Sequence, residues 1–349
     1  MFLGKHLFWW IAIAGTLTLA ALAEAQSRSP LLLVVSRGEN SLAFVDAQTG
    51  KLVGRIATGL LPHQVVVSSD GKLAFVSNTS SGGPETGRVI PSISVIDIAS
   101  RKELRRVKIG ARSRPHDMVF AGGKLYFTAE GYKLIGCYNP ATDEIEWLLG
   151  NGQDRTTMMA VNQEVTKIYA TNIGSGTVTV MEQVPVDEQK NINTLWNLSV
   201  DWTVSQLSVG KQPQGIDISP DGEELWIAHL GNGGIWIIDI ATQRVKEKLD
   251  VPTEASTRMK FAPGGELLLI VDRNGDELVV LDPSARKEVK RLKMDHPQEL
   301  LITPDGSRAY VVLADENRIA VIDLKTLEVT GHIPSHGTEP EGMAWVDAS

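Results

Sequence analysis

Cysteine is nearly absent from this sequence: Cys137 is the only one among 349 residues. A single thiol cannot form an intrachain disulfide, and it cannot supply a CxxCH haem-attachment motif or an all-cysteine zinc or iron–sulfur site. The fold must therefore be stable without covalent cross-links. We expect Cys137 to behave as a small buried hydrophobic residue.

Positive charge is also in short supply. The chain has 34 Lys and Arg residues against 42 Asp and Glu residues, which gives a formal net charge of −8 and a pI near 5.5. Proteins that bind nucleic acids nonspecifically, or that bind anionic membranes, need a cationic surface. We therefore expect neither nucleic acid nor an anionic membrane among the partners of this protein.

Only one long apolar run occurs, and it stands at the N-terminus. Lys5 and His6 precede the apolar residues Leu7–Ala23, and the small residues at Ala23–Ala25 resemble a cleavage site. This order is typical of a secretory signal peptide over residues 1–25, with an uncleaved membrane anchor as the alternative. No second run of this kind follows. We expect a periplasmic or secreted protein with no membrane span after cleavage.

Several familiar catalytic motifs are missing as well. The sequence has no GxSxG nucleophile elbow, no HExxH zinc motif and no phosphate-binding P-loop. It also lacks a dinucleotide-binding glycine fingerprint between a strand and a helix. The sequence leaves open whether the protein is an enzyme.

Glycine and proline, by contrast, are frequent, at 32 and 16 residues, and they punctuate a repeated unit. Each unit has a first strand, a turn such as Pro304-Asp305-Gly306, and three more short strands. The base period of about 42 residues suits four short strands per unit. Seven such units begin at Pro62, Pro115, Thr156, Pro213, Ser256, Pro297 and Pro340.

The first strand of each unit indicates that the repeat is β-structure. Two alternating positions are apolar in all seven units, as Val65 and Val67 illustrate in the first one. A period of two with one constant face is typical of a strand and not of a helix. The third strand of each unit ends in a residue whose side chain we expect to stabilise the following turn. These residues are Asp46, Asp97, Asn139, Glu182, Asp239, Asp282 and Asp323.

The seventh unit is split between the two ends of the chain. Pro340–Val346 supplies only a first strand, and Leu31–Ile56 supplies the other three. Pairing of the two ends would close a ring and remove the open edges that a linear array has to cap. The sequence therefore predicts an all-β fold: one seven-bladed β-propeller over residues 26–349, with four-stranded antiparallel blades. We expect a monomer, because ring closure removes one usual reason for strand-mediated assembly.

The repeats resemble a known family. Gly71–Asn78 and Lys167–Asn172, each followed by a Val-x-Val strand, are similar to the YVTN repeat of YncE-like and surface-layer-associated β-propellers. The resemblance covers nearly all of residues 31–347 and implies the seven-bladed fold. It does not imply one activity, because related propellers include binding proteins, lactonases, streptogramin lyases and electron-transfer subunits.

The predicted site lies at one mouth of the central channel. In this fold the loop before the first strand and the loop after the second strand reach the same face, where polar side chains can converge on a ligand. The second residue of each unit forms a ring there and is polar in all seven units: His63, His116, Thr157, Gln214, Thr257, Gln298 and Glu341. The next position adds Gln64, Asp117, Met158, Arg258 and Glu299. The ends of the second strands add Ser36, Asn78, Asn172, His229 and Asp272.

Within this ring, Glu341, His63 and His116 come from consecutive units. Two imidazoles and a carboxylate can bind a divalent metal, or they can act as acid and base. A solvated channel mouth without any ligand is the alternative that the same residues allow. The sequence identifies no other cofactor.

These observations lead to three hypotheses about function. The first is an exported, non-catalytic propeller that binds a small molecule or a protein partner at the channel mouth. The second is a metal-dependent enzyme of the lactonase or lyase type that uses Glu341, His63 and His116, with His229 as a further candidate. The third is a component of a periplasmic redox or metal-handling system, which would need a partner for electrons.

Overall fold

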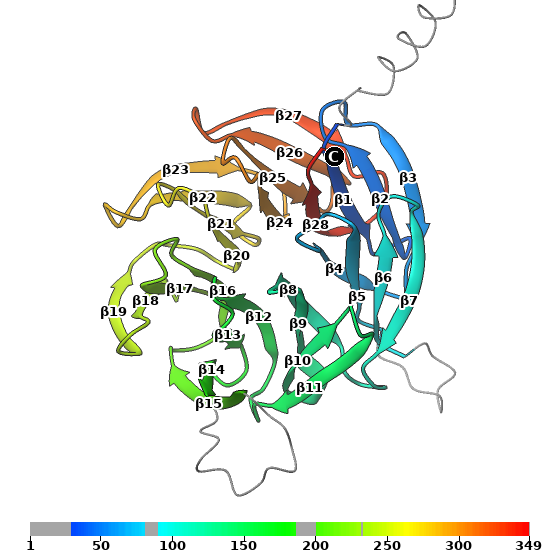
Figure 1. The fold of residues 1–349 in the computed structure, drawn as a ribbon. Coiled ribbons are helices and arrows are strands. Elements are labelled where there is room, and N and C mark those ends of the chain that lie inside the picture. The colour runs from blue at the N-terminus through cyan, green and yellow to red at the C-terminus, as the bar shows by residue number, and fades with distance from the viewer. Residues whose placement is uncertain (1–28, 81–89, 186–199, 232, 349) are drawn as a thin grey trace, which may run out of the picture.

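The computed structural model describes residues 29–80, 90–185, 200–231 and 233–348. The predicted signal peptide lies outside these residues. Within the described part, 28 strands form seven four-stranded antiparallel sheets around a central axis (Figure 1). The predicted seven-bladed propeller is therefore confirmed.

Each blade runs from an inner first strand to an outer fourth strand. Blades 1 to 3 are β4 (Pro62–Val67), β5 (Leu73–Asn78), β6 (Ser92–Asp97) and β7 (Lys102–Lys108); β8 (Pro115–Ala121), β9 (Lys124–Ala129), β10 (Leu134–Asn139) and β11 (Glu144–Gly150); and β12 (Thr156–Val161), β13 (Lys167–Asn172), β14 (Thr177–Pro185) and β15 (Val200–Ser208). Blades 4 and 5 are β16 (Pro213–Ile218), β17 (Glu224–His229), β18 (Ile235–Asp239) and β19 (Arg244–Leu249); and β20 (Ser256–Phe261), β21 (Leu268–Asp272), β22 (Glu277–Asp282) and β23 (Lys287–Lys293). Blades 6 and 7 are β24 (Pro297–Ile302), β25 (Arg308–Leu313), β26 (Arg318–Asp323) and β27 (Glu328–Pro334); and β28 (Pro340–Val346), β1 (Leu31–Ser36), β2 (Ser41–Asp46) and β3 (Leu52–Ala57).

Blade 7 joins the two ends of the chain. The C-terminal strand β28 pairs antiparallel with β1, so that Leu32 faces Trp345 and Val34 faces Met343. The ring is thereby closed by backbone hydrogen bonds between residues more than 300 positions apart. The predicted split of the seventh unit is confirmed.

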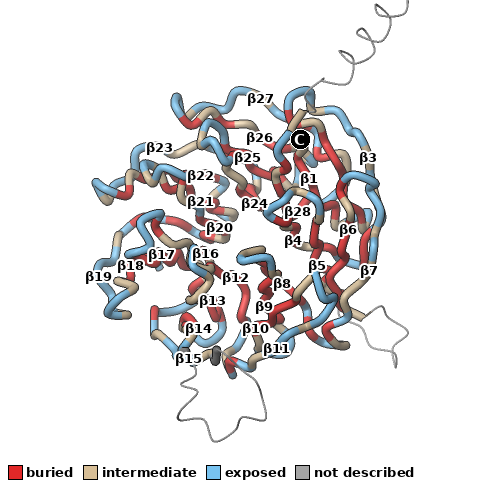
Figure 2. The backbone as a smooth tube through the Cα atoms, viewed as in Figure 1, coloured by how far each residue is buried: buried red, intermediate tan, exposed pale blue. Residues whose placement is uncertain are grey.

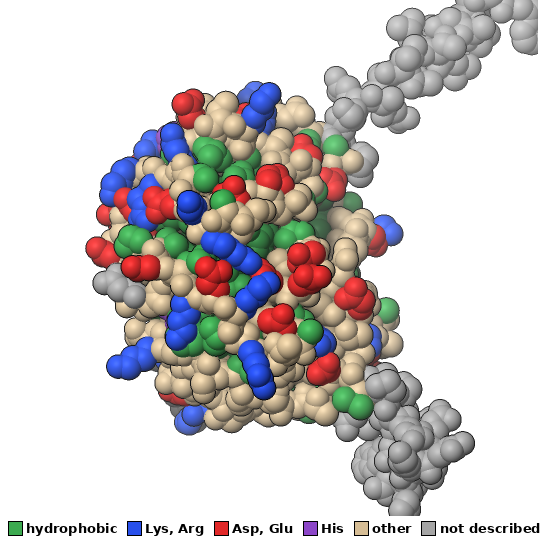
Figure 3. Space-filling model, turned by 90° about the vertical axis from the view of Figure 1, so that its left-hand side faces the viewer, with side chains coloured by type: hydrophobic (Ala, Val, Ile, Leu, Met, Phe, Trp, Pro, Cys, Tyr) green, Lys and Arg blue, Asp and Glu red, His purple; other side chains and the backbone are tan. Residues whose placement is uncertain are grey.

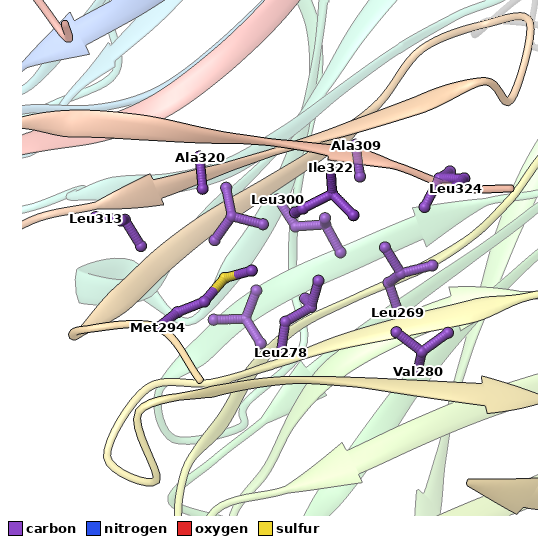
Figure 4. Packing of buried hydrophobic residues seen from close by; sticks show 12 residues of the cluster. Leu269, Leu278, Val280, Met294, Leu300, Ala309, Leu313, Ala320, Ile322 and Leu324 are labelled. Atoms are coloured by element: carbon purple, nitrogen blue, oxygen red, sulfur yellow. The ribbon is translucent and has the colours of Figure 1, made fainter. Parts of the chain in front are cut away.

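The apolar core lies between neighbouring blades. The second and third strands of the blades are almost entirely buried, whereas the outer strands are largely exposed (Figure 2). Figure 4 shows one interblade cluster, in which Leu269 and Leu278 of blade 5 pack with Leu300 and Ile322 of blade 6. Cys137 is a buried free thiol, as expected.

The turns after the third strands are held by the predicted side chains. Asp46 Oδ1 accepts hydrogen bonds from the backbone N–H groups of Gln48 and Thr49, at 3.0 and 2.7 Å. Equivalent bonds are made by Asp97, Asn139, Asp239, Asp282 and Asp323. Glu182 differs, because it pairs with the Lys167 ammonium at 3.1 Å. This column of acidic and amide side chains therefore stabilises turns.

The first strand of every blade carries a β-bulge close to its start. In β4, Pro62 pairs with Asn78, whereas the next paired residue, Val65, pairs with Val76. The register shifts near the same place in the other six first strands. A bulge leaves consecutive residues unpaired and redirects their side chains. The neighbouring residues His63 and Gln64 can therefore both reach the central axis.

Helical structure contributes little to the described residues, which include one short 3-10 turn, η2 (Glu130–Tyr132). None of the helices in the described ranges has the length and apolar character needed to cross a membrane. Figure 3 shows one flank of the propeller, on which acidic and basic side chains are interspersed. This flank offers no continuous cationic patch.

The closing strand supplies the first testable prediction. Met343 is 6% exposed and packs with Leu32, Val34 and residues of blade 6. We expect Met343→Ala to lower the free energy of unfolding by about 2–4 kcal/mol, because it leaves a cavity at the closing contact. Urea denaturation followed by circular dichroism measures this loss.

The matched control is Val329→Ala on the outer strand β27, where the side chain is 39% exposed. We expect this variant to stay within about 1 kcal/mol of the wild-type protein. Equal losses in the two variants would contradict a central role for the closing contact.

Candidate functional site

The residue that precedes each first strand has an unusual backbone conformation. In six of the seven blades its φ lies between 45° and 56°, although none of these six residues is glycine. These residues are Leu61, Arg114, Arg155, Gln212, His296 and Glu339. A positive φ is uncommon for such side chains and marks a tight change of chain direction. Two of them, Arg114 and Arg155, line a cavity at the channel mouth.

The second residue of each unit is called the ring position here. The ring positions of blades 7, 1 and 6 make direct contacts: His63 Nδ1 lies 3.1 Å from Glu341 Oε2, and Gln298 Nε2 donates to the same oxygen at 2.9 Å. The His116 ring packs edge-on against His63, with 4.3 Å between the ring centroids. Glu341, His63 and His116 therefore lie together, as their spacing in the sequence implied.

The cavity above this ring has a volume of about 170 Å³. His63, His116, Thr157 and Gln214 line its floor and walls, together with Thr79 and Ile173. Its rim carries three guanidinium groups, those of Arg37, Arg114 and Arg155, and one carboxylate, that of Glu130. The mouth of this acidic protein is therefore locally cationic.

The three arginines are bound to different extents. Arg37 Nη1 lies 2.9 Å from Glu341 Oε1, so this guanidinium is already paired within the ring. Arg114 and Arg155 share the carboxylate of Glu130 at 3.5 and 3.7 Å, and about half of each arginine side chain is exposed. These two arginines are only weakly paired, and their guanidinium groups are free to bind an anion from solution.

Five of the seven ring positions hold a buried polar atom that has no hydrogen-bond partner among the described residues. These atoms are His63 Nε2, His116 Nδ1, Thr157 Oγ1, Thr257 Oγ1 and Gln298 Oε1. Most buried polar groups in folded proteins are paired, and an unpaired one costs about 1–3 kcal/mol. Five of the eight such atoms in the described residues therefore stand at one position of the repeat, and the ring keeps hydrogen-bonding capacity that the described side chains do not use.

Charge in the ring is unevenly distributed. Burial alone would raise the pKa of Glu341, but the hydrogen bonds from His63, Arg37 and Gln298 and the charge of His63 lower it to about 2. Burial, together with the positive charges of His63 and nearby arginines, holds the pKa of His116 well below its ordinary value. The ring therefore contains a carboxylate and, at His116, a neutral imidazole.

The third residue of each unit is called the inner position, and in the five units where it is not glycine its side chain belongs to a second layer below the ring. Arg258 Nε donates to Glu299 Oε2 at 2.9 Å, and Gln64 Nε2 donates to the same oxygen at 3.0 Å. Arg258 also contacts Met158 Sδ at 2.6 Å. These buried side chains link blades 1, 3, 5 and 6 across the axis. They separate the mouth from a further cavity of about 460 Å³, which all seven first strands line.

Asp117 belongs to this inner layer and not to the mouth. Its Oδ2 accepts a hydrogen bond from the Met159 N–H at 2.9 Å, and burial raises the pKa of its carboxyl. Both Asp117 and Arg258 line the cavity below the layer. Of the predicted site residues, these two lie one level deeper than the ring.

Four predicted residues at the ends of second strands do not line the mouth cavity. Asn78 and Asn172 bind neighbouring strands and loops, and Asp272 accepts hydrogen bonds from the backbone of Glu254 and Ala255. His229 has a backbone carbonyl oxygen within hydrogen-bond distance of each ring nitrogen, at 3.1 and 2.7 Å. These side chains hold strands and loops in place, although Asn78 Oδ1 itself has no hydrogen-bond partner among the described residues.

The predicted metal site has no support in the geometry. In residues 29–80, 90–185, 200–231 and 233–348, no group of three or more His, Cys, Asp or Glu side chains could hold a metal ion. Although Glu341, His63 and His116 lie together, Glu341 contacts one nitrogen of His63 and the two imidazole rings pack edge-on at an interplanar angle of 67°.

Sequence reasoning missed Arg37, Arg114, Arg155 and Glu130. A weak signal existed for two of them, because Arg114 and Arg155 stand directly before a first strand in consecutive blades. Nothing in the sequence indicated that this position adopts a positive φ, and therefore nothing placed it on the rim.

Comparisons with known proteins agree with this fold and add a family. Residues 93–304, more than half of the chain, match the family model described as Cytochrome D1 heme domain. Protein NirF of Stutzerimonas stutzeri is 31% identical over 106 residues, which are 30% of this chain and 26% of that protein. The matched part is thus about a quarter of the length of this curated relative.

Solved structures with the same architecture have diverse descriptions. Hydrazine synthase of Kuenenia stuttgartiensis superposes with a TM-score of 0.66 at 19% identity, over 82% of this chain and 90% of that one. Dihydro-heme d1 dehydrogenase NirN in complex with DHE gives 0.61 at 13% identity, over 92% and 76%. The periplasmic gluconolactonase PpgL of Pseudomonas aeruginosa gives 0.71 at 14% identity, over 92% and 99%. At these identities the likeness shows the fold alone.

The carboxylate of Glu341 makes stability depend on pH. Its pKa is about 2 in the folded protein, against an ordinary value of 4.5. At pH values above 4.5 the ionised carboxylate therefore stabilises the native state. We expect Glu341→Gln to lower the free energy of unfolding by about 3 kcal/mol near neutral pH. This difference from the wild-type protein should shrink as the pH falls from 4.5 towards 2.

Urea denaturation of both proteins at a series of pH values tests this expectation. A difference that stays constant down to the lowest pH would mean that the Glu341 carboxylate is not held in its charged form by the ring.

Proposed function

The chain belongs to the cytochrome D1 heme domain family, and from this premise we propose that its channel mouth binds a tetrapyrrole of the heme d1 class. One structural relative, NirN, is described as a dihydro-heme d1 dehydrogenase, which points to the same class of ligand. The ligand of this propeller would then be a flat, iron-containing ring system with acidic side chains.

The observation that carries this proposal is the ring of unpaired buried polar atoms at the mouth. A ligand that covers the ring would pair with several of these atoms at once. The atoms surround one axis, and they include hydroxyl, amide and imidazole groups. A flat ligand with polar atoms around its circumference matches this arrangement better than a compact one.

The arginines of the rim fit the acidic groups of such a ligand. Tetrapyrroles of the haem type carry carboxylate side chains, and guanidinium groups bind carboxylates through two parallel hydrogen bonds. Arg114 and Arg155 are the available partners, because Arg37 is already bound to Glu341. We therefore place the carboxylates over blades 2 and 3.

The His63–His116 pair fits the centre of the ligand. When bound, the iron of such a tetrapyrrole supplies a coordination position that an imidazole nitrogen can fill. Both histidines line the cavity, and each has a ring nitrogen with no partner among the described residues. Since His116 is kept neutral by burial, the pair does not bring two positive charges to the ligand.

The size of the cavity limits how the ligand is held. Pockets that enclose a drug-sized molecule have volumes of about 300–1,000 Å³. The mouth cavity measures about 170 Å³. The ligand would therefore lie partly outside it.

Other parts of the sequence-based interpretation remain proposals. The metal-dependent lactonase alternative has no metal site among the described side chains to build on. Export to the periplasm or beyond rests on the signal-like residues 1–25, which lie outside the described residues. Membership of the YVTN-type family and the monomeric state also stay predictions.

Titration with a tetrapyrrole tests the proposal directly. We expect the purified protein to take up one equivalent of heme d1, or of iron protoporphyrin IX as an accessible probe, with a saturable shift of the main absorption band. Arg114→Gln and Arg155→Gln should each weaken binding about 10- to 100-fold, because each removes a charge-assisted hydrogen bond of about 1.5–3 kcal/mol.

The matched control is Arg244→Gln on the outer strand β19, where the side chain is exposed and far from the mouth. It should bind as tightly as the wild-type protein. Absence of a saturable shift, or equal affinities for all three arginine variants, would rule out the mouth as the site.

A further inference from the structure

We propose that Glu341 is a positioning residue that fixes the ring orientation and the tautomer of His63. The Glu341 carboxylate accepts hydrogen bonds from three side chains, and it therefore has little freedom to move. His63 Nδ1 and Gln298 Nε2 approach Oε2 at 3.1 and 2.9 Å, and Arg37 Nη1 approaches Oε1 at 2.9 Å. Only about one tenth of the Glu341 side chain is exposed.

A carboxylate acts only as an acceptor, and this decides the tautomer of the imidazole. The nitrogen of His63 that faces Glu341 must carry the proton, because a carboxylate has none to donate. In a neutral His63 the lone pair is therefore on Nε2, the nitrogen with no partner among the described residues.

The two imidazoles of the mouth therefore differ in their support. Nδ1 of His63 faces the buried carboxylate of Glu341, which has three hydrogen-bond partners, whereas Nδ1 of His116 has no partner among the described residues. His116 contributes its ring edge, at 4.3 Å between centroids, which limits the rotation of His63 from the other side. Glu341 and His116 together leave His63 one orientation.

Glu341 reaches His63 only when the ring is closed. Glu341 stands on the C-terminal strand β28, His63 on β4 of blade 1, and Gln298 on β24 of blade 6. Three blades thus meet at one carboxylate. The positioning of His63 depends on the closing contact between β28 and β1.

The tautomer can be measured without any ligand. Two-bond ¹⁵N–¹H correlation spectra of the ¹⁵N-histidine-labelled protein, recorded above the ordinary pKa of histidine, report which ring nitrogen is protonated. We expect the Nδ1–H form for His63 in the wild-type protein. We expect Glu341→Ala to release His63 to the Nε2–H form that free histidine favours, and Glu341→Gln, whose amide oxygen still accepts, to preserve Nδ1–H.

The control variant is Glu328→Ala on the exposed outer strand β27, which should leave the His63 signals unchanged. An Nε2–H tautomer in the wild-type protein overturns the inference, and this outcome needs no variant to fold. An unchanged Nδ1–H form in a folded Glu341→Ala variant also overturns it.

The consequence for ligand binding rests on the proposed function and is tested separately. If His63 contacts the tetrapyrrole, Glu341→Ala should weaken binding of iron protoporphyrin IX about 10- to 100-fold and change the absorption band of the complex. A wild-type protein with the Nδ1–H tautomer but no uptake of the probe would reject the proposed function and leave the positioning role intact. Uptake of the probe by a protein whose His63 has the Nε2–H tautomer would reject the positioning role and leave the proposed function intact.

Discussion

The antiparallel pairing of β28 with β1 is the contact on which the rest of the structure depends. It completes the seventh four-stranded sheet from the two ends of the chain and so closes the ring, and it gives β1 a partner on the side where that strand would otherwise be an edge. The same pairing places Glu341 beside His63 and within reach of Arg37. One set of backbone hydrogen bonds therefore both completes the fold and assembles the polar mouth.

Closure alone would produce a ring of strands, and two local backbone features turn that ring into a site. The bulge at the start of the first strand directs two consecutive residues to the axis, and in the five blades without glycine at the second of them this builds the ring layer and the inner layer from neighbouring side chains. The left-handed residue before the strand then brings a third side chain to the rim, as Arg114 and Arg155 show. In blades 2 and 3, residues within a stretch of four thus occupy three levels of the mouth: Arg114, His116 and Asp117 in one, and Arg155, Thr157 and Met158 in the other.

These features explain what the sequence could and could not predict. The apolar alternation seen at Val65 and Val67, and the division of the seventh unit between the chain ends, predicted the fold completely, because strand period and edge pairing follow simple rules. The ring of polar residues was predicted by counting from each unit start. His229 and Asp272 were misjudged as mouth residues because a strand end reaches the correct face without necessarily pointing to the axis. Arg114 and Arg155 were missed because a positive φ before a strand has no clear signal in sidechain type.

The two layers of the mouth differ in how their buried polar groups are paired. This difference distinguishes a layer that supports the fold from a layer that is available to a ligand. In the inner layer, Arg258, Glu299 and Gln64 satisfy one another, so this layer is complete without a ligand. In the ring above it, five polar atoms are buried without partners in the described chain. A protein whose blades pack through continuous apolar clusters can bear the cost of a few unpaired groups, but chance alone would scatter them over the molecule. Five of the eight such atoms in the described residues instead share one position of the repeat, beside the cationic rim, and this is the arrangement expected when an anionic ligand completes the hydrogen bonding that the chain leaves open.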